Sequence, residues 1–174
     1  MKNITYNQTV KEAIALALLQ LMNQKPFAEI TISEIVKIAG VGRSSFYRNF
    51  DNKEQVLSDY IQTLYHDFFS DKNVMSRMPK NADNTKDFLL PRFKFVKQNR
   101  NFFAIVRKHN LLYHVFEQME PDLILLLTGQ DESLSKYYRS MFSGSCAGII
   151  RSWIDNNFVE TEEEMVNIFT TFPR

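Results

Sequence analysis

Apolar residues recur every three or four positions through most of this chain, which is the spacing of an amphipathic helix. The first such stretch covers residues 6–23, and Lys25-Pro26 ends it because the residue before a proline avoids the helical region. No strand-like alternation is sustained anywhere. In the second half of the chain the same spacing predicts helices over residues 85–99 (where Pro91 implies a kink or a late start), 100–108, 111–128, 133–157 and 161–172.

The second helix is predicted from the signals at its two ends. Thr31 and Glu34 stand three residues apart, as in a capping box, in which a hydroxyl and a carboxylate each bond a backbone N–H. We expect Ile38 to be among the residues on its inward face, and Gly40 to end the helix in the left-handed conformation. The pattern therefore predicts one short, well-capped helix between Thr31 and Gly40.

Two more helices follow at once. One covers residues 43–49, and the next is expected over about residues 52–70, with Asn52 as its cap and Gln55 as the reciprocal partner. The polar stretch MPKNADNT (78–85) is the best candidate for a boundary. We therefore expect an N-terminal domain over residues 1–70 and a helical second domain over residues 71–174.

Composition narrows the class of protein. Hydrophobic residues make up 44% of the 174 residues, and only five Gly and five Pro are present, which favours a packed helical protein. Cys146 is the only cysteine and cannot form an internal disulfide, so a reducing cytoplasm is the simple interpretation. The N-terminus does not resemble a secretory leader, and the longest apolar runs are too short to span a bilayer. We expect a soluble cytoplasmic protein with no membrane contact.

Charge is distributed in blocks. Residues 1–71 hold seven basic and eight acidic side chains, residues 72–110 hold ten basic and two acidic, and residues 111–174 hold four basic and ten acidic. The basic middle could contact DNA or an acidic partner. We favour the alternative that it lies against the acidic last third, because such blocks usually form solvated or paired helix faces.

The stretch AGVGRSSFYRNF (39–50) carries the candidate chemistry. Two short helices joined by a tight Gly-containing turn form a helix-turn-helix, whose second helix enters the DNA major groove. Phe46 and Phe50 lie four residues apart and should bury one face. Gly42 leaves the backbone bare at the start of this helix, and exposed Arg, Asn and Tyr side chains suit guanine, adenine and thymine or phosphate. The candidate DNA-binding residues are Thr31, Arg43, Ser44, Ser45, Tyr47, Arg48, Asn49 and Lys53, of which Thr31 and Lys53 should clamp the DNA backbone on either side.

The run TISEIVKIAGVGRSSFYRNFDNKEQVL (31–57) resembles the N-terminal signature of the TetR family of bacterial transcriptional regulators, and the resemblance covers about residues 8–65. It departs from the family at Gly42, where the family often has Ser or Thr. The resemblance implies a DNA-binding head made of helices one to four, with the fourth as the connecting helix. It implies an antiparallel all-helical body that binds a ligand and forms a dimer.

The predicted helix over 133–157 has a stripe of bulky apolar residues and a stripe of small ones. The small stripe would let a second helix backbone approach closely, so we expect it to form a homodimer interface together with the last helix. The alternative is that the small stripe packs within one subunit. The candidate interface residues are Gly144, Ser145, Gly148, Ser152 and Phe169.

A cavity in the body could hold a small-molecule effector of unknown identity. Its candidate lining residues are Phe95, Phe103, Val106, Tyr113, Phe116 and Tyr138, and the alternative is that these aromatics are plain core. His66, His109 and His114 lack the spacing and partners of a metal site, so we expect no metal. No nucleophile with a base and no phosphate loop is present, so we expect neither an enzyme nor a cofactor.

The sequence thus predicts a TetR-like regulator, a repressor, that binds a palindromic operator as a homodimer and is released by a small molecule. The competing hypothesis is a dimeric helical scaffold or adaptor whose degenerate head no longer binds DNA.

Overall fold

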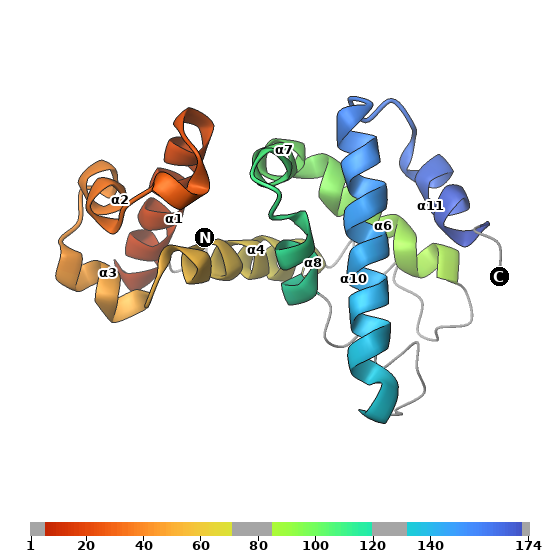
Figure 1. Cartoon of the computed structure of the whole chain (residues 1–174), viewed down its shortest axis with the longest axis horizontal. Coiled ribbons are helices and arrows are strands. Elements are labelled where there is room, and N and C mark those ends of the chain that lie inside the picture. The colour runs from red at the N-terminus through yellow and green to blue at the C-terminus, as the bar shows by residue number, and fades with distance from the viewer. Residues whose placement is uncertain (1–5, 71–84, 120–131, 172–174) are drawn as a thin grey trace. The chain divides into compact units, whose positions relative to one another are not determined.

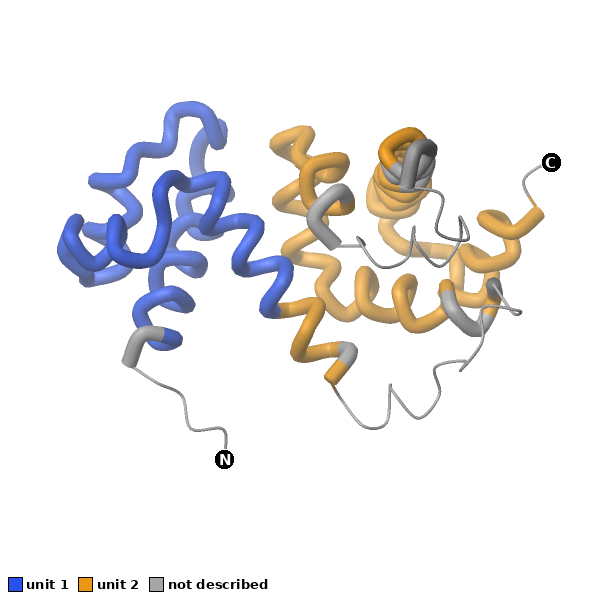
Figure 2. Tube along the Cα trace, turned by 90° about the horizontal axis from the view of Figure 1, so that it is seen from below, with its two compact units in different colours: residues 1–63 blue, residues 64–174 orange. Residues whose placement is uncertain are grey.

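The computed structural model describes residues 6–70, 85–119 and 132–171, and within these ranges every regular element is a helix (Figure 1). The chain forms two compact units, residues 1–63 and 64–174, which we call the head and the body (Figure 2). The division falls inside α4 (Lys53–Phe69), whereas the prediction from sequence counts all of this helix with the head. In the three ranges, each helix is too short or too polar to cross a membrane.

The head begins with α1 (Tyr6–Gln24), η1 (Phe27–Glu29) and α2 (Ile32–Ala39), followed by α3 (Arg43–Asn49) and the start of α4. The predicted capping box is present: the Glu34 N–H donates to Thr31 Oγ1 over 3.3 Å, and the Thr31 N–H donates to Glu34 Oε2 over 3.0 Å. Gly40 ends α2 with φ +66°. The ends of α2 are therefore fixed by its own sequence.

Apolar side chains from all four helices fill the centre of the head. Phe46 and Phe50, from α3 and the residue that follows it, are 0% and 2% exposed. The buried apolar residues of the head are Val10, Ile14, Ala15, Ala17, Leu18, Leu21, Met22, Ile30, Ile35, Val36, Phe46, Phe50, Val56, Leu57 and Ile61.

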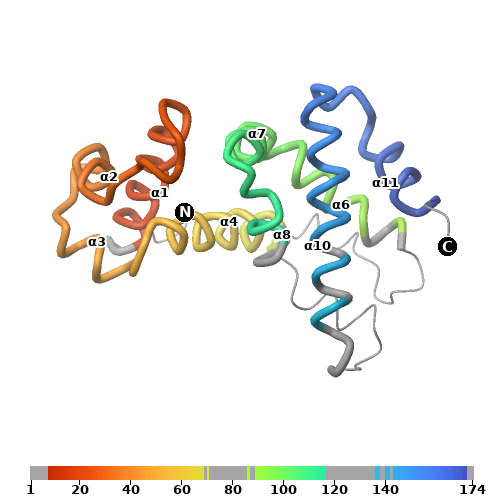
Figure 3. The backbone as a smooth tube through the Cα atoms, in the orientation of Figure 1, coloured from red at the N-terminus to blue at the C-terminus, as the bar shows by residue number. Residues whose placement is uncertain are grey.

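The body contains α6 (Thr85–Gln98), α7 (Arg100–Lys108), α8 (Leu112–Met119), α10 (Glu132–Asp155) and α11 (Glu162–Thr170) (Figure 3). α6 packs against α11, and α10 packs against both α7 and α8. The segments that pack together are thus far apart in the sequence. The part of the predicted 111–128 helix beyond Met119 lies outside the described residues.

Aromatic rings form much of the body core. Trp153 on α10 is 1% exposed, and its ring meets Phe93 at 5.8 Å and Phe158 at 5.0 Å between centroids. Phe158 has φ +55°, a conformation that is costly for a bulky residue. Its ring contact with Trp153, and the bond from its N–H to the Trp153 carbonyl at 2.9 Å, offset that cost.

Three details of the sequence prediction need correction. Ile38 is 40% exposed, because the inward face of α2 runs through Ile35 and Val36 and leaves Ile38 roughly a third of a turn away. The Gln55 N–H donates to Asn52 Oδ1 over 2.8 Å, as expected for a helix cap. Gln55 Oε1, however, accepts from the Asp51 N–H and not from the Asn52 N–H. α6 begins at Thr85 with Pro91 inside it, so the helix has no late start. The short η1 was not predicted.

Candidate nucleic-acid interface

The turn between α2 and α3 is tight and closed by backbone hydrogen bonds. The Val41 N–H donates to the Val36 carbonyl over 3.1 Å beyond the left-handed Gly40. Gly42 is the cap residue of α3 and makes no side-chain capping bond. The turn thus leads directly into α3, and the cap residue makes no side-chain bond to the first N–H groups of that helix.

α3 has one buried and one exposed face. The rings of Phe46 and Phe50 lie 5.9 Å apart in the interior of the head. Tyr47 is 51% exposed, and its ring stands edge-on to Phe46 at 5.5 Å between centroids, so the buried ring orients the exposed one. Arg43 and Arg48 are also exposed. This places an aromatic ring and two guanidinium groups on the outer side of one short helix.

The structure divides the eight candidate DNA-binding residues into two groups. Thr31, Arg43, Ser44, Tyr47 and Arg48 are exposed, whereas Ser45, Asn49 and Lys53 are half-buried. Asn49 Nδ2 donates to the Ser45 carbonyl over 2.8 Å, so one of its two amide donors serves its own helix. That these residues contact DNA stays a prediction.

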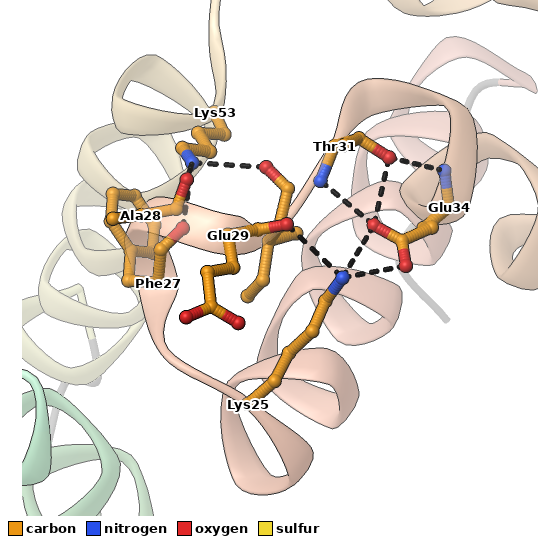
Figure 4. Close-up of polar contacts among 8 residues, drawn as sticks. Lys25, Phe27, Ala28, Glu29, Thr31, Glu34 and Lys53 are labelled. Atoms are coloured by element: carbon orange, nitrogen blue, oxygen red, sulfur yellow. Dashed lines mark hydrogen bonds and ion pairs between the residues drawn. The ribbon is translucent and has the colours of Figure 1, made fainter.

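Thr31 and Lys53, the two expected backbone clamps, both make contacts inside the head. The Thr31 hydroxyl donates to Glu34 Oε2 over 2.7 Å, and Lys53 Nζ donates to the carbonyls of Phe27, Ala28 and Ile30 (Figure 4). A hydrogen bond from Lys25, followed by those from Thr31, lowers the pKa of Glu34 from 4.5 to about 2. The Glu34 carboxylate therefore stays ionised beside the start of α2.

Two supporting residues were missed by the sequence reasoning. Lys25 Nζ binds both carboxylate oxygens of Glu34, at 2.6 and 2.7 Å. Lys11 Nζ binds Asp59 Oδ1 at 2.8 Å and lies 5.3 Å from the centroid of the Phe50 ring. Neither pair has a helical i, i+4 spacing, so only the fold brings them together.

Two family models match the chain. One, described as bacterial regulatory proteins of the tetR family, matches residues 14–60. The other, described as a transcriptional regulator C-terminal region, matches residues 83–173, more than half of the chain. The chain belongs to the TetR family. Its helix-turn-helix is that of a transcriptional regulator, as the sequence resemblance implied.

Individual relatives agree with the family. The chain is 22% identical over 160 residues to the uncharacterized HTH-type transcriptional regulator YxbF of Bacillus subtilis (strain 168), covering 84% of this chain and 40% of that protein. It is 25% identical to the HTH-type dhaKLM operon transcriptional activator DhaS of Lactococcus lactis subsp. lactis (strain IL1403), covering 67% of this chain and 66% of DhaS. The chain thus spans less than two thirds of the length of either relative.

A solved structure shares the fold. The crystal structure of a TetR transcriptional regulator from Streptococcus agalactiae 2603V aligns with a TM-score of 0.60 and 19% sequence identity, covering 95% of this chain and 93% of that one. This likeness confirms the predicted all-α, TetR-like fold class.

In this TetR-family body, most of the candidate effector-pocket residues are core. Phe95, Phe103 and Val106 are fully buried, and Phe116 is 7% exposed. The Phe103 ring stacks on Phe116 at 5.8 Å and meets Phe95 edge-on at 5.9 Å. Tyr113 is instead 43% exposed, and the side chain of Tyr138 lies outside the described residues.

The small-residue stripe of α10 faces outward. Gly144, Ser145, Gly148 and Ser152 are all exposed, whereas Phe169 on α11 is half-buried. A groove of about 390 Å³ runs along this side of α10 and α11. Its lining includes Gly148, Ser152, Trp153, Glu160, Met165 and Ile168. The exposure of these four residues favours the interface over the alternative that the stripe packs inside one subunit.

The basic segment meets the acidic end of the chain, as favoured from the sequence. Lys97 Nζ lies 2.9 Å from Glu162 Oε2, and Arg107 Nη2 lies 2.9 Å from Asp155 Oδ2. Lys86 Nζ donates to the side chain of Asn167 over 2.9 Å.

Across the described ranges, no group of three or more His, Cys, Asp or Glu side chains is arranged to hold a metal ion.

Proposed function

We propose that this TetR-family regulator binds a palindromic operator as a homodimer, with one α3 in the major groove of each half-site. The observation that carries the proposal is the two-faced geometry of α3. Phe46 is fully buried, while the adjacent Tyr47 and Arg48 project outward. An exposed polar helix face anchored from behind is the element that a helix-turn-helix inserts into a groove.

The chemistry of this face suits DNA. A guanidinium group can bind the O6 and N7 atoms of guanine in a bidentate manner, which assigns base recognition to Arg48. Arg43 lies in the first turn of α3, and its proposed role is to bind phosphate. Tyr47 offers its ring to a thymine methyl group or its hydroxyl to a phosphate.

Dimerisation is proposed through α10 and α11. Tyr137 and Met141 on α10 are each 64% exposed, and Ile168 on α11 is 52% exposed. They accompany the exposed small-residue stripe and the groove between the two helices. A second copy would cover this apolar surface, and a palindrome of two half-sites about one helical turn apart requires two heads.

We further propose that a small molecule in the body weakens operator binding and that the regulator represses its target genes. The helical body and the family support an effector, and a cavity for it would open among the buried side chains of Phe95, Phe103 and Phe116. DhaS is named as an activator. A reporter gene behind the operator therefore has two informative outcomes: expression that rises on deletion of the regulator supports repression, and expression that falls shows activation.

Selection of duplexes from a random-sequence pool tests operator binding. We expect enrichment of an inverted repeat whose half-sites lie about one helical turn apart. Without any enrichment, the proposal of DNA binding fails and the scaffold hypothesis takes its place. That alternative is favoured by the composition of residues 1–71, which hold seven basic and eight acidic side chains, and by the internal contacts of Lys11, Lys25 and Lys53.

A further inference from the structure

Two ammonium groups hold four consecutive carbonyls between α1 and α2. Lys53 Nζ donates to the carbonyls of Phe27, Ala28 and Ile30, at 2.6, 3.1 and 2.9 Å. Lys25 Nζ donates to the Glu29 carbonyl over 3.1 Å as well as to the Glu34 carboxylate. Figure 4 shows the two side chains reaching this segment, residues 27–30, from different directions.

The ammonium of Lys53 is fully used in these contacts. A lysine has three N–H donors, and three backbone carbonyls lie within hydrogen-bond distance of Nζ. The ammonium also lies 4.7 Å from the centroid of the Phe27 ring, which favours a cation. A DNA phosphate could recruit Lys53 only by displacing these contacts, which would take the lysine donor from the partly buried Ile30 carbonyl, whereas the Phe27 carbonyl would keep the bond from the Ile30 N–H.

Lys53 joins the two chain segments that flank the recognition helix. It is the first residue of α4, three positions after Phe50, which ends α3. The carbonyls that it binds end one residue before Thr31, the cap of α2. Its contacts therefore fix the start of α2 to the start of α4, and α3 lies between these two points in the chain.

We propose that Lys53 is a positioning residue that orients α3 through these carbonyls, and that it does not contact phosphate. The proposal rests on the proposed function, since it concerns how the head meets DNA. It reassigns the cationic contacts of the head to the exposed Arg43 and Arg48 on α3. It also replaces the expectation that Lys53 clamps the DNA backbone.

The test compares Lys53→Met with Arg43→Met, since both changes remove one positive charge and keep an apolar stem. Binding is measured over a range of salt on a duplex selected from a random pool and on a scrambled duplex. For Lys53→Met we expect the ratio of the two affinities to fall by about tenfold, as when one base pair of a site is mismatched. We expect its salt slope to stay unchanged, whereas Arg43→Met should reduce the slope by about 0.9 for each phosphate that is no longer neutralised.

A structural readout separates this proposal from the proposed function. Lys53→Met should lower the midpoint of thermal unfolding, whereas Lys37→Met, at an exposed position of α2, should not. If Lys53→Met is too unstable to purify, Lys25→Met probes the same segment, because Lys25 binds the Glu29 carbonyl. This variant should also lower the ratio of the affinity for the selected duplex to that for the scrambled duplex.

Three results would overturn the proposal. A reduced salt slope for Lys53→Met with an unchanged affinity ratio would make Lys53 a phosphate contact. An equal loss of affinity for the selected and the scrambled duplex would show that Lys53 contributes to binding without regard to sequence. An unchanged midpoint of thermal unfolding for Lys53→Met would show that the carbonyl contacts do not hold the head together. This readout does not depend on DNA. Failure of the wild-type chain to bind either duplex would instead contradict the proposed function.

Discussion

The head and the body present different surfaces to their surroundings. In the head, the exposed side of α3 carries Tyr47 among arginines and serines, in the pattern of a surface for a polyanion. In the body, α10 and α11 expose Tyr137, Met141 and Ile168 beside small residues, which is the pattern of a surface that another protein covers. We therefore propose that one surface of this chain binds nucleic acid and that another binds a second copy of the chain.

The two units also differ in what holds them together. The polar contacts of the head are helix caps and lysines bound to backbone and carboxylate oxygens, such as Lys53 on the carbonyls of Phe27, Ala28 and Ile30. The body relies on contacts between segments far apart in sequence, such as the Lys97–Glu162 ion pair and the Phe93–Trp153 ring contact. We infer that single substitutions in the head will separate folding from binding most cleanly.

The largest expected effect comes from comparing a substitution on the buried face of α3 with one on its exposed face. Phe46→Ala should lower the free energy of unfolding by about 3–5 kcal/mol, because it removes a fully buried ring. Tyr47→Ala, at the next position, should change stability by about 0.5 kcal/mol or less and weaken DNA binding instead. Urea unfolding measures the first effect and a binding titration the second. A comparable loss of stability in both variants would contradict the two-faced geometry.

The sequence predicts different amounts of the structure in the head and in the body. The bounds of α3, the capping box at Thr31 and the left-handed Gly40 were predicted correctly, because each depends on residues only a few positions apart. The contacts of Lys53 with the carbonyls of Phe27, Ala28 and Ile30 were not predicted, since no spacing rule joins positions more than twenty residues apart.

In the body, the spacing of apolar residues predicted which of them share a helix face, but not which of them another helix covers. The exposure of Tyr113 and the burial of Phe103 depend on how α7, α8 and α10 pack against one another. A pocket residue and a core residue therefore have the same signature in the sequence.

The body surface is tested by Gly148→Arg. An added Cβ at this exposed position meets no atom within 4 Å, so the single subunit should tolerate the change. In a dimer the guanidinium would be buried without a partner, and the dissociation constant should rise at least about hundredfold. Sedimentation velocity over a range of protein concentrations measures it.

The matched control is Gly148→Ala, which should stabilise α10 by roughly 0.5–1 kcal/mol without disturbing a close helix contact in the monomer. An unchanged monomer–dimer equilibrium for Gly148→Arg would place the dimer interface elsewhere.

The smallest expected effect is the part of the acid-range pH dependence of stability that comes from Glu34 in the head, since the pKa values of Glu162 and Glu164 in the body are lowered as well. The pKa of Glu34 is about 2 in the fold against 4.5 ordinarily, so its contribution to stability is present above the ordinary value and is lost as the pH falls through the folded value. We expect the unfolding midpoint of the wild-type chain to fall between about pH 5 and pH 2. Glu34→Gln should flatten this part of the profile, and Gln at the exposed Glu29 should not; identical profiles for all three proteins would exclude the Lys25–Glu34–Thr31 contacts as its source.

The central claim is that α3 reads DNA, and a binding titration of the wild-type chain and Arg48→Ala on the selected duplex tests it most directly. We predict that the logarithm of wild-type affinity falls linearly with the logarithm of salt concentration. Arg48→Ala should lose about 1–3 kcal/mol of binding free energy and relax the preference at one base pair, with unchanged unfolding. Wild-type affinity for Arg48→Ala, or binding insensitive to salt, would contradict the claim.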